Sequence, residues 1–250
     1  MTQRVRRFDS SSDEYHKAFQ LFLDHTDQKA RARERLEKLV AGLPSRNVFI
    51  DAGAGTGKVT AWLEGSFGRT IAAEPNASLR KELAATCPSA EILGDMILDA
   101  KIAPKADFVL ASHVFYYIDG RDWMPNLERL ASWLAPQGMA TVILQNRKTD
   151  CMEMLRHFLR QSFDLNLLAS AFDKAHAGKY RTSVHTVPSF IRTPDLETAC
   201  RVAEFMLNLL PLADPPAMAD LRSYVDRNFK HEGGYRFSCT QDFLEIQKLG

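Results

Sequence analysis

Two alternating patterns of apolar residues run through the middle of the chain. Short apolar runs of strand length are separated by longer segments whose apolar residues recur at helical spacing. Strands that alternate with helices in this way are typical of a parallel sheet covered by helices. The pattern therefore predicts an α/β fold, with strands at 48–50, 70–73, 92–93, 107–112 and 139–144.

Two helices are predicted before the first strand. Tyr15, Phe19 and Phe22 fall on one face of a helix, at positions i, i+4 and i+7, and a second helical pattern follows. In an open α/β enzyme, ligands bind at the carboxyl ends of the strands, and additions ahead of the sheet cover that crevice. We therefore expect residues 1–46 to form a helical lid whose aromatic face contacts substrate, and residues 47–250 to form a single compact domain.

A polar cluster follows the aromatic face of the first predicted helix. Asp27 and Gln28 belong to it, close to His25. One interpretation is a solvated helix end with its cap. The other is a group of side chains that faces the substrate, and both interpretations stay open at this point.

The two ends of the chain are patterned less regularly than its middle. The first 14 residues are polar and are expected to be loosely ordered. Near the other end, strand-like segments at 180–191 and 236–246 would close the sheet with an antiparallel pair. Helices are predicted around and between these two segments, at 152–163, 165–175, 194–210 and 216–229.

Composition and charge narrow the classes of function. The chain has 32 basic and 31 acidic residues, for a net charge of +1, so no nucleic-acid or membrane surface is expected. No apolar run approaches the roughly 20 residues that cross a bilayer. The four cysteines show no C-x-x-C spacing, which predicts reduced thiols in a cytoplasmic protein rather than a metal site or a disulfide framework.

The stretch that says most about chemistry follows the first predicted strand. Asp51 is followed by Gly53, Gly55 and Gly57 at alternate positions, and a helical pattern begins at Lys58. Glycine lets a backbone approach a ligand closely because it has no Cβ and tolerates positive φ. The first turn of the following helix supplies free N–H groups. The stretch therefore predicts a ligand-binding turn between a strand and a helix.

Three kinds of nucleotide site use such a turn. The P-loop is excluded, because Ala52 stands where its first glycine belongs and Val59 where its magnesium-binding hydroxyl belongs. The dinucleotide fingerprint G-x-G-x-x-G fails because Lys58 takes the place of the third glycine. An acid followed by G-x-G-x-G fits at every position, and it resembles motif I of the class I S-adenosylmethionine (SAM)-dependent methyltransferases. An ordinary glycine-rich turn is the alternative.

That resemblance implies a fold and a cofactor. The strands, helices and turns from residue 47 to residue 145 follow the plan of a class I methyltransferase. The implied fold is a Rossmann-like sheet of seven strands. The implied cofactor is SAM, with S-adenosylhomocysteine as the product.

Acidic residues follow the second and third predicted strands. Glu74 comes 17 residues after Gly57, near the place where an acid binds ribose hydroxyls in this type of fold. A carboxylate can accept both hydrogen bonds of a cis-diol, although Glu74 could instead cap the next helix. The resemblance implies that Asp95 meets the adenine amino group and that Met96 packs on the ring, and a plain turn role for Asp95 stays open.

The fourth predicted strand ends where the transferred methyl group would lie. Ser112 and His113 extend past its carboxyl end, and Tyr116 and Tyr117 follow. His113 is the candidate general base because the reference pKa of histidine is close to neutrality. It could equally form a hydrogen-bonded pocket wall. The tyrosines could cover an aromatic or cationic substrate, or one of them could pack under the next helix.

Short motifs at both ends of the chain resemble histamine N-methyltransferase and its relatives. They are a Y-x-x-x-F-x-x-F-L-D-H-T run from Tyr15, the pair Glu74-Pro75, the segment 114–118, and the F-S-C-T run that begins at Phe237. The resemblance implies a monomeric methyltransferase of small molecules with an aromatic-walled pocket; a homodimer is left open. The segment after the fourth predicted strand also lacks the [Asn/Asp]-Pro-Pro-aromatic motif of methyltransferases that modify DNA bases or glutamine.

This sequence departs from the resembling family at three positions. Gln28, with Asp27 beside it, replaces a substrate-binding glutamate, and His113 replaces a glutamine. Ser238 and Cys239 replace a pair of asparagines. The expected acceptor is therefore an amine or N-heterocycle rather than histamine itself. O- or C-methylation of a phenol or other metabolite, a NAD-dependent oxidoreductase and a SAM-binding protein without turnover are the alternatives.

The predicted site thus has three groups of residues. The catalytic group is His113, Tyr116 and Tyr117, and no metal is expected. The cofactor-binding group is Asp51, Gly53, Gly55, Gly57, Glu74, Pro75, Asp95, Met96 and Ser112. The substrate-binding group is Tyr15, Phe19, Phe22, Asp27, Gln28 and Ser238.

Overall fold

The computed structural model of the chain describes residues 3–9, 12–210 and 212–250. The chain divides into two compact units, each built from segments that are not contiguous in the sequence. The large-sheet unit comprises residues 33–144, 164–186 and 242–250, and the small-sheet unit comprises residues 1–32, 145–163 and 187–241. The boundary expected at residue 46 stays a prediction.

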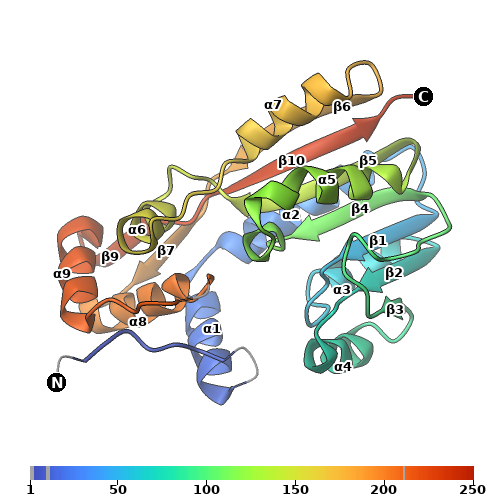
Figure 1. Cartoon of the computed structure of the whole chain (residues 1–250). Helices are drawn as coiled ribbons and strands as arrows, with labels where there is room; N and C mark the ends of the chain where they lie inside the picture. The colour runs from blue at the N-terminus through green and yellow to red at the C-terminus, as the bar shows by residue number, and fades with distance from the viewer. Residues whose placement is uncertain (1–2, 10–11, 211) are drawn as a thin grey trace. The chain divides into compact units, whose positions relative to one another are not determined.

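A seven-stranded sheet forms the large-sheet unit, in the order β3-β2-β1-β4-β5-β10-β6 (Figure 1). β1 pairs in parallel with both β2 and β4, and β2–β3 and β4–β5 are also parallel. In Figure 1 the arrow of β10 points in the opposite direction to that of β4. The predicted seven-stranded α/β sheet is confirmed. Its strands are β1 (Val48–Ala52), β2 (Arg69–Ala73), β3 (Glu91–Leu93), β4 (Ala106–Ser112), β5 (Leu134–Gln145), β6 (Tyr180–Val187) and β10 (Gln241–Lys248).

The core of this unit surrounds its central strands. Phe49 and Ile50 of β1 and Phe108 and Val109 of β4 are adjacent along the chain and yet all fully buried. Successive side chains of a strand point to opposite faces, so both faces of these strands are covered, as in parallel sheets generally. The helices of this unit are α3 (Thr60–Leu63), α4 (Ala77–Thr86), α5 (Trp123–Ser132), α7 (Leu165–Ala175) and most of α2 (Gln28–Ala41).

Two helices are shorter than the sequence pattern predicts. α3 begins at Thr60 rather than at Lys58 and gives way to a 3₁₀ turn at Glu64–Ser66. The helical pattern of the sequence predicts a helix from Trp123 to Leu134, but α5 ends at Ser132, because Leu134 is already paired with Ala106 in the sheet. Helical periodicity in the sequence does not reveal such pairing.

The small-sheet unit has four helices among its described residues and an antiparallel sheet in the order β7-β9-β8. The aromatic face predicted for the first helix is present on α1, where the ring of Phe22 lies 5.5 Å from that of Phe205 in α8. The helices are α1 (Asp13–His25), α6 (Asp150–Leu159), α8 (Leu196–Leu207) and α9 (Met218–Phe229), and the strands are β7 (Phe190–Thr193), β8 (Lys230–His231) and β9 (Gly234–Ser238).

Each of the two strands predicted near the C-terminus is in fact two strands. The segment 180–191 divides into β6 and β7, and the segment 236–246 into β9 and β10. β6 and β10 belong to the seven-stranded sheet, whereas β7 and β9 belong to the three-stranded one. Pro188 offers no N–H to a sheet, and Ser189 and Cys239 hydrogen-bond to each other instead.

The residues before α1 are tied down rather than loosely ordered, so that prediction is wrong for residues 3–9. Val5 is buried, and its N–H donates to the carbonyl of Pro216 at 3.0 Å. Arg6 forms a bidentate ion pair with Glu204 of α8, a carboxylate only 1% exposed. These partners lie about two hundred positions away in the sequence, so local polarity could not predict them. Met1, Thr2, Ser10 and Ser11 lie outside the described residues.

Among the described residues, no helix combines the length and the apolar character needed to cross a membrane.

Candidate functional site

The glycine loop, residues 53–57, connects β1 to α3 in the large-sheet unit. Gly53, Gly55 and Gly57 all have positive φ, at 83°, 56° and 82°. A Cβ on Gly53 would lie 2.4 Å from Val114 Cγ2, and one on Gly57 would lie 2.8 Å from Leu83 Cδ1. A Cβ on Gly55 would enter open space. The loop backbone thus packs closely on both sides and is open at its middle residue.

Asp51 lies beneath this loop, at the end of β1. It is 1% exposed, and Thr60 Oγ1 donates a hydrogen bond to its Oδ2 at 2.7 Å. Burial raises the pKa of Asp51 to about 7; the hydrogen bond from Thr60 opposes that rise, and the charge of Glu74 adds to it. Asp51 therefore joins the end of the strand to the start of the helix across the glycine loop.

Glu74 follows β2 and contacts the same loop. Its Oε2 accepts from the N–H of Gly55 at 2.9 Å, and its Oε1 accepts from the N–H of Asn76 at 2.9 Å. The N-cap of α4 is Asn76, whose Oδ1 accepts from the first turn of the helix, so Glu74 is not the helix cap. A carboxylate has about four lone-pair sites, so two stay available for a ligand.

The two predicted adenine contacts, Asp95 and Met96, lie on the surface of the large-sheet unit. Asp95 and Met96 follow β3, and Met96 is 55% exposed, which is uncommon for so apolar a side chain. The carbonyl of Pro75 accepts from Arg80 Nη1 at 2.6 Å, which ties the segment after β2 to α4. Their contact with a nucleotide stays a prediction.

The segment after β4 adopts a backbone conformation that is uncommon for a residue other than glycine. His113 has φ of 60°, and its N–H donates to the carbonyl of Ile143 at 2.9 Å. Positive φ in a residue other than glycine stores strain and is concentrated at functional sites. The ring of His113 stacks on that of Tyr116, with centroids 5.8 Å apart. Val114 is the residue that packs against Gly53, so this segment adjoins the glycine loop.

The two tyrosines of this segment have different surroundings. Tyr116 is 5% exposed and stacked on His113, whereas Tyr117 is 67% exposed. Both lie in a 3₁₀ turn, Phe115–Tyr117, whose Phe115 carbonyl accepts from Trp123 Nε1 at 3.1 Å. Tyr116 thus packs on the histidine and Tyr117 is exposed, and contact of either with a ligand stays a prediction. Ser112 ends β4, paired with Ile143.

The predicted aromatic substrate contacts lie in the small-sheet unit. The rings of Tyr15, Phe19 and Phe22 lie 5.7, 5.7 and 5.5 Å from the ring of Phe205. Burial raises the pKa of Tyr15. The three rings thus pack α1 against α8, and their contact with a substrate stays a prediction.

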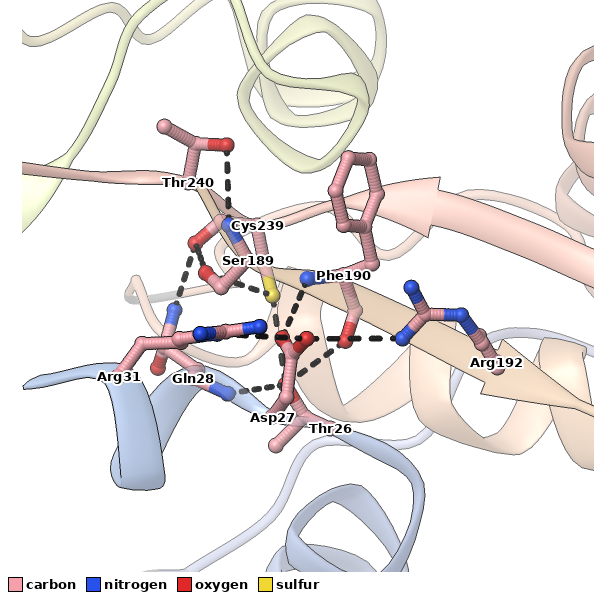
Figure 2. A network of polar contacts seen from close by, with 9 residues as sticks. All are labelled: Thr26, Asp27, Gln28, Arg31, Ser189, Phe190, Arg192, Cys239 and Thr240. Atoms are coloured by element: carbon pink, nitrogen blue, oxygen red, sulfur yellow. Dashed lines mark hydrogen bonds and ion pairs between the residues drawn. The ribbon is translucent and has the colours of Figure 1, made fainter. Parts of the chain in front are cut away.

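The other predicted substrate contacts, Asp27 and Gln28, belong to a network of polar contacts that we call the junction cluster (Figure 2). Asp27 Oδ1 accepts from the N–H of Phe190 at 2.7 Å. Gln28 is 3% exposed, and its Nε2 donates to the carbonyl of Cys239 at 2.9 Å. The solvated-helix-end interpretation is therefore wrong for Gln28. The cluster consists of Thr26, Asp27, Gln28, Arg31, Ser189, Phe190, Arg192, Cys239 and Thr240.

Ser238 is held by a separate pair of contacts in the same unit. Asp150 Oδ2 accepts from both the N–H and the Oγ of Ser238, at 2.7 and 2.8 Å. The N–H of Asp150 donates back to Ser238 Oγ at 2.9 Å. This exchange fixes the start of α6 to the end of β9.

Sequence reasoning missed several polar residues that shape these sites. Thr60 lies nine positions after Asp51, and a hydroxyl in the first turn of the predicted helix was a detectable signal for it. Ser189 and Asp150 could not be found in this way, because their partners lie 50 and 88 residues away. No group of three or more His, Cys, Asp or Glu side chains that could hold a metal ion occurs within the described part of the chain.

Comparison with known proteins adds the following. A family model described as a methyltransferase domain matches residues 23–207. No curated protein sequence gives a significant match.

Solved structures with the same fold cover nearly all of this chain. A putative methyltransferase from Bacillus halodurans aligns over 87% of this chain and 99% of its own, with a TM-score of 0.65 and 9% identity. The N-methyltransferase NodS from Bradyrhizobium japonicum, in complex with S-adenosyl-L-homocysteine, aligns over 95% and 99%, with a TM-score of 0.58 and 10% identity. The plantazolicin methyltransferase BpumL aligns over 89% and 85%, with a TM-score of 0.56 and 10% identity. At these identities the likeness concerns the fold alone.

Proposed function

The chain belongs to the methyltransferase-domain family, and from this premise we propose that it transfers a methyl group from SAM to a nitrogen atom of a small amine or N-heterocycle. One observation carries the proposal. The glycine loop has three positive φ angles, and the Glu74 carboxylate bonded to it keeps two acceptor sites. The loop and the carboxylate stand at the carboxyl ends of neighbouring parallel strands, where ligands bind in open α/β sheets.

The residues of the large-sheet unit fit the cofactor. The glycine loop would hold the amino-acid part, with the open space beside Gly55 available to it. Glu74 would accept the ribose hydroxyls, and Asp95 and Met96 would contact adenine. When bound, SAM supplies an electrophilic methyl group on a sulfonium. Asp51 and Thr60 keep the loop in shape.

His113 is proposed to interact with the proton on the acceptor nitrogen, either as a general base or as a hydrogen-bond partner. Its strained backbone and its stack on Tyr116 hold the ring in place, and the next residue, Val114, packs against Gly53. An acceptor that arrives as a neutral amine needs positioning rather than deprotonation, and a hydrogen bond to His113 would position it. The exposed ring of Tyr117 would cover the acceptor by stacking or by a cation–π contact.

The environment proposed for the protein is cytoplasmic. All four cysteines are buried and free, which supports a reducing compartment. A monomer is the proposed state, as the resemblance implies.

Calorimetry with S-adenosylhomocysteine tests the proposal. We expect a dissociation constant in the micromolar range, and affinity only in the millimolar range would reject cofactor binding. Glu74→Ala should weaken binding by about 1.5–3 kcal/mol, the range for hydrogen bonds to a charged group. Glu82→Ala, on the exposed side of α4, is the matched control and should leave affinity unchanged.

A mass-spectrometric screen with SAM identifies the acceptor. Libraries of amines, N-heterocycles and phenols should be compared, and mass gain on the amines and heterocycles is expected. Methylation of phenols alone would move the proposal to O-methylation.

A further inference from the structure

Two arginines of the small-sheet unit face each other across neighbouring strands. Arg192 of β7 and Arg236 of β9 are direct partners in the antiparallel register. Their neighbours in that register, Ile191 and Phe237, are fully buried on the other face of the sheet. Like charges directly opposite each other destabilise an antiparallel pair, so the arginine pair, Arg192 and Arg236, calls for an explanation.

The acidic groups near the arginine pair do not balance it. Arg192 Nη1 lies 3.5 Å from Asp27 Oδ2, and Arg31 Nε lies 4.0 Å from the same oxygen (Figure 2). Asp27 is thus shared between two guanidinium groups. Asp150 is bonded to Ser238 of the same strand as Arg236, and its Oδ2 accepts from both the N–H and the Oγ of that serine.

Arg236 is the less satisfied member of the pair. Its Nε is buried and has no hydrogen-bond partner in the structure. Within residues 3–9, 12–210 and 212–250, no ion pair to Arg236 is observed. A buried donor without a partner costs about 1–3 kcal/mol, and such groups are rare in native proteins.

An aromatic ring that contacts both arginines accounts for the position of their guanidinium groups but leaves N–H donors without a partner. Arg236 Cζ lies 3.9 Å from the centroid of the Phe190 ring, and Arg192 Cζ lies 5.3 Å from it. Cation–π contacts of this kind are attractive. They use the flat face of the guanidinium, whereas its N–H groups point outward in its plane. The cation–π contacts therefore hold both guanidinium groups in place and leave N–H groups of each arginine able to donate to a ligand.

We propose that Arg192, Arg236 and Phe190 bind an oxyanion, the carboxylate or phosphate group of a small organic molecule. The planar fork of a guanidinium matches both groups and binds them with two parallel hydrogen bonds. An oxyanion bound by N–H groups of both guanidiniums would reduce the repulsion between them. The site lies wholly in the small-sheet unit, and the proposal does not depend on methyl transfer.

Titration of the cofactor-free protein with benzoate and with inorganic phosphate tests this site, followed by NMR or calorimetry at low ionic strength. Wild-type protein should bind at least one of them with a millimolar or lower dissociation constant and should not bind neutral benzamide. Arg236→Gln and Arg192→Gln should each weaken binding at least tenfold. Arg236→Lys, which keeps the charge and loses the fork, should weaken it several-fold. Arg227→Gln removes an exposed arginine of α9 in the same unit and should change affinity less than twofold.

The two probes separate the two sources of the oxyanion. Tighter binding of benzoate identifies a carboxylate ligand, and tighter binding of phosphate identifies a phosphate ligand. The proposal is overturned if wild-type protein binds neither probe, or if Arg236→Gln and Arg192→Gln bind them as the wild type does. Should Arg236→Gln fail to fold, as judged by circular dichroism, Arg192→Gln carries the test. Calorimetry with S-adenosylhomocysteine on the same samples reports on the proposed function separately.

Discussion

The glycine loop and the part of the junction cluster around Gln28 and the Cys239 carbonyl are both hydrogen-bonded and packed, yet they differ in the hydrogen-bonding capacity that they leave unused. Around the glycine loop, the Glu74 carboxylate uses two of its acceptor sites, and the space beside Gly55 is open. In the junction cluster, the Cys239 carbonyl accepts from both Gln28 and Ser189, and Asp27 is bonded to Phe190. Spare hydrogen-bonding capacity beside open space is typical of a binding site, whereas satisfied and buried groups stabilise a fold. Four predictions test this distinction.

The largest effect is expected at His113. His113→Gln should lower turnover about 10²–10⁴-fold if the imidazole moves the proton, the usual contribution of a positioned acid–base group. Affinity for S-adenosylhomocysteine should barely change. The pH profile of the wild-type turnover should contain an ionisation near neutrality that the variant lacks. A variant that keeps most of its turnover would reduce His113 to a positioning residue.

The second effect concerns the shape of the glycine loop. Gly53→Ala places a methyl group 2.4 Å from Val114 Cγ2 at a positive φ, and it should lower the free energy of unfolding by about 1–3 kcal/mol. It should also weaken the binding of S-adenosylhomocysteine, because the loop must shift. Gly65→Ala meets no atom within 4 Å and should leave both quantities unchanged. Unaltered binding by Gly53→Ala would mean that the loop does not hold the cofactor.

The third effect tests the junction cluster as a stabilising element. Gln28→Ala removes the buried donor to the Cys239 carbonyl and should lower the free energy of unfolding by about 1–3 kcal/mol. Affinity for S-adenosylhomocysteine should stay the same. Gln20→Ala, which removes an exposed bond to Asp24 on α1, should change stability by less than about 0.5 kcal/mol. If Gln28→Ala is as stable as the wild type but loses turnover, Gln28 serves the substrate after all.

Measured per pH unit, the smallest effect is the pH dependence that Asp51 adds to stability. Because burial raises the pKa of Asp51 from 3.8 to about 7, the folded state binds a proton that the unfolded state releases between those values. This contribution is fully present below pH 3.8 and is lost as the pH rises through about 7, with a slope of at most about 1.4 kcal/mol per pH unit.

Denaturant titrations between pH 4 and pH 8 measure this slope. Asp51→Asn should flatten the curve, and Asp99→Asn, at an exposed site, should not. If the wild type and Asp51→Asn give parallel curves, the pKa of Asp51 is not raised. Since an ionised Asp51 favours a cationic cofactor, affinity for SAM should rise as the pH rises through about 7.

What the sequence predicted well depends on local signals. The apolar runs of β1, β2 and β4 are each continuous in the sequence, and the glycines directly follow β1, so their pattern predicts the α/β fold and the glycine turn. The number of seven strands comes from the resemblance to class I methyltransferases. Asn76 as the cap of α4 is also a local signal, and it settles one of the open alternatives at Glu74.

What the sequence did not predict depends on distant partners. The breaks between β6 and β7 and between β9 and β10 arise where Ser189 and Cys239 bond to each other, 50 residues apart. The strand pattern continues through both breaks, so periodicity alone reads each pair as one strand. The ion pair of Arg6 with Glu204 spans 198 residues. The closer resemblance to histamine N-methyltransferase stays a prediction.

The attachment of residues 3–9 to α8 has a consequence for synthesis on the ribosome. Arg6 is translated about two hundred residues before its partner Glu204 and the Pro216 carbonyl to which the N–H of Val5 donates. Segment 33–144, by contrast, is continuous and supplies five strands of the seven-stranded sheet. Because domains fold as their segments become available, that part of the sheet should assemble first. Residues 3–9 should dock after that part of the sheet has formed, and until then their arginines stay accessible to nascent-chain chaperones and proteases.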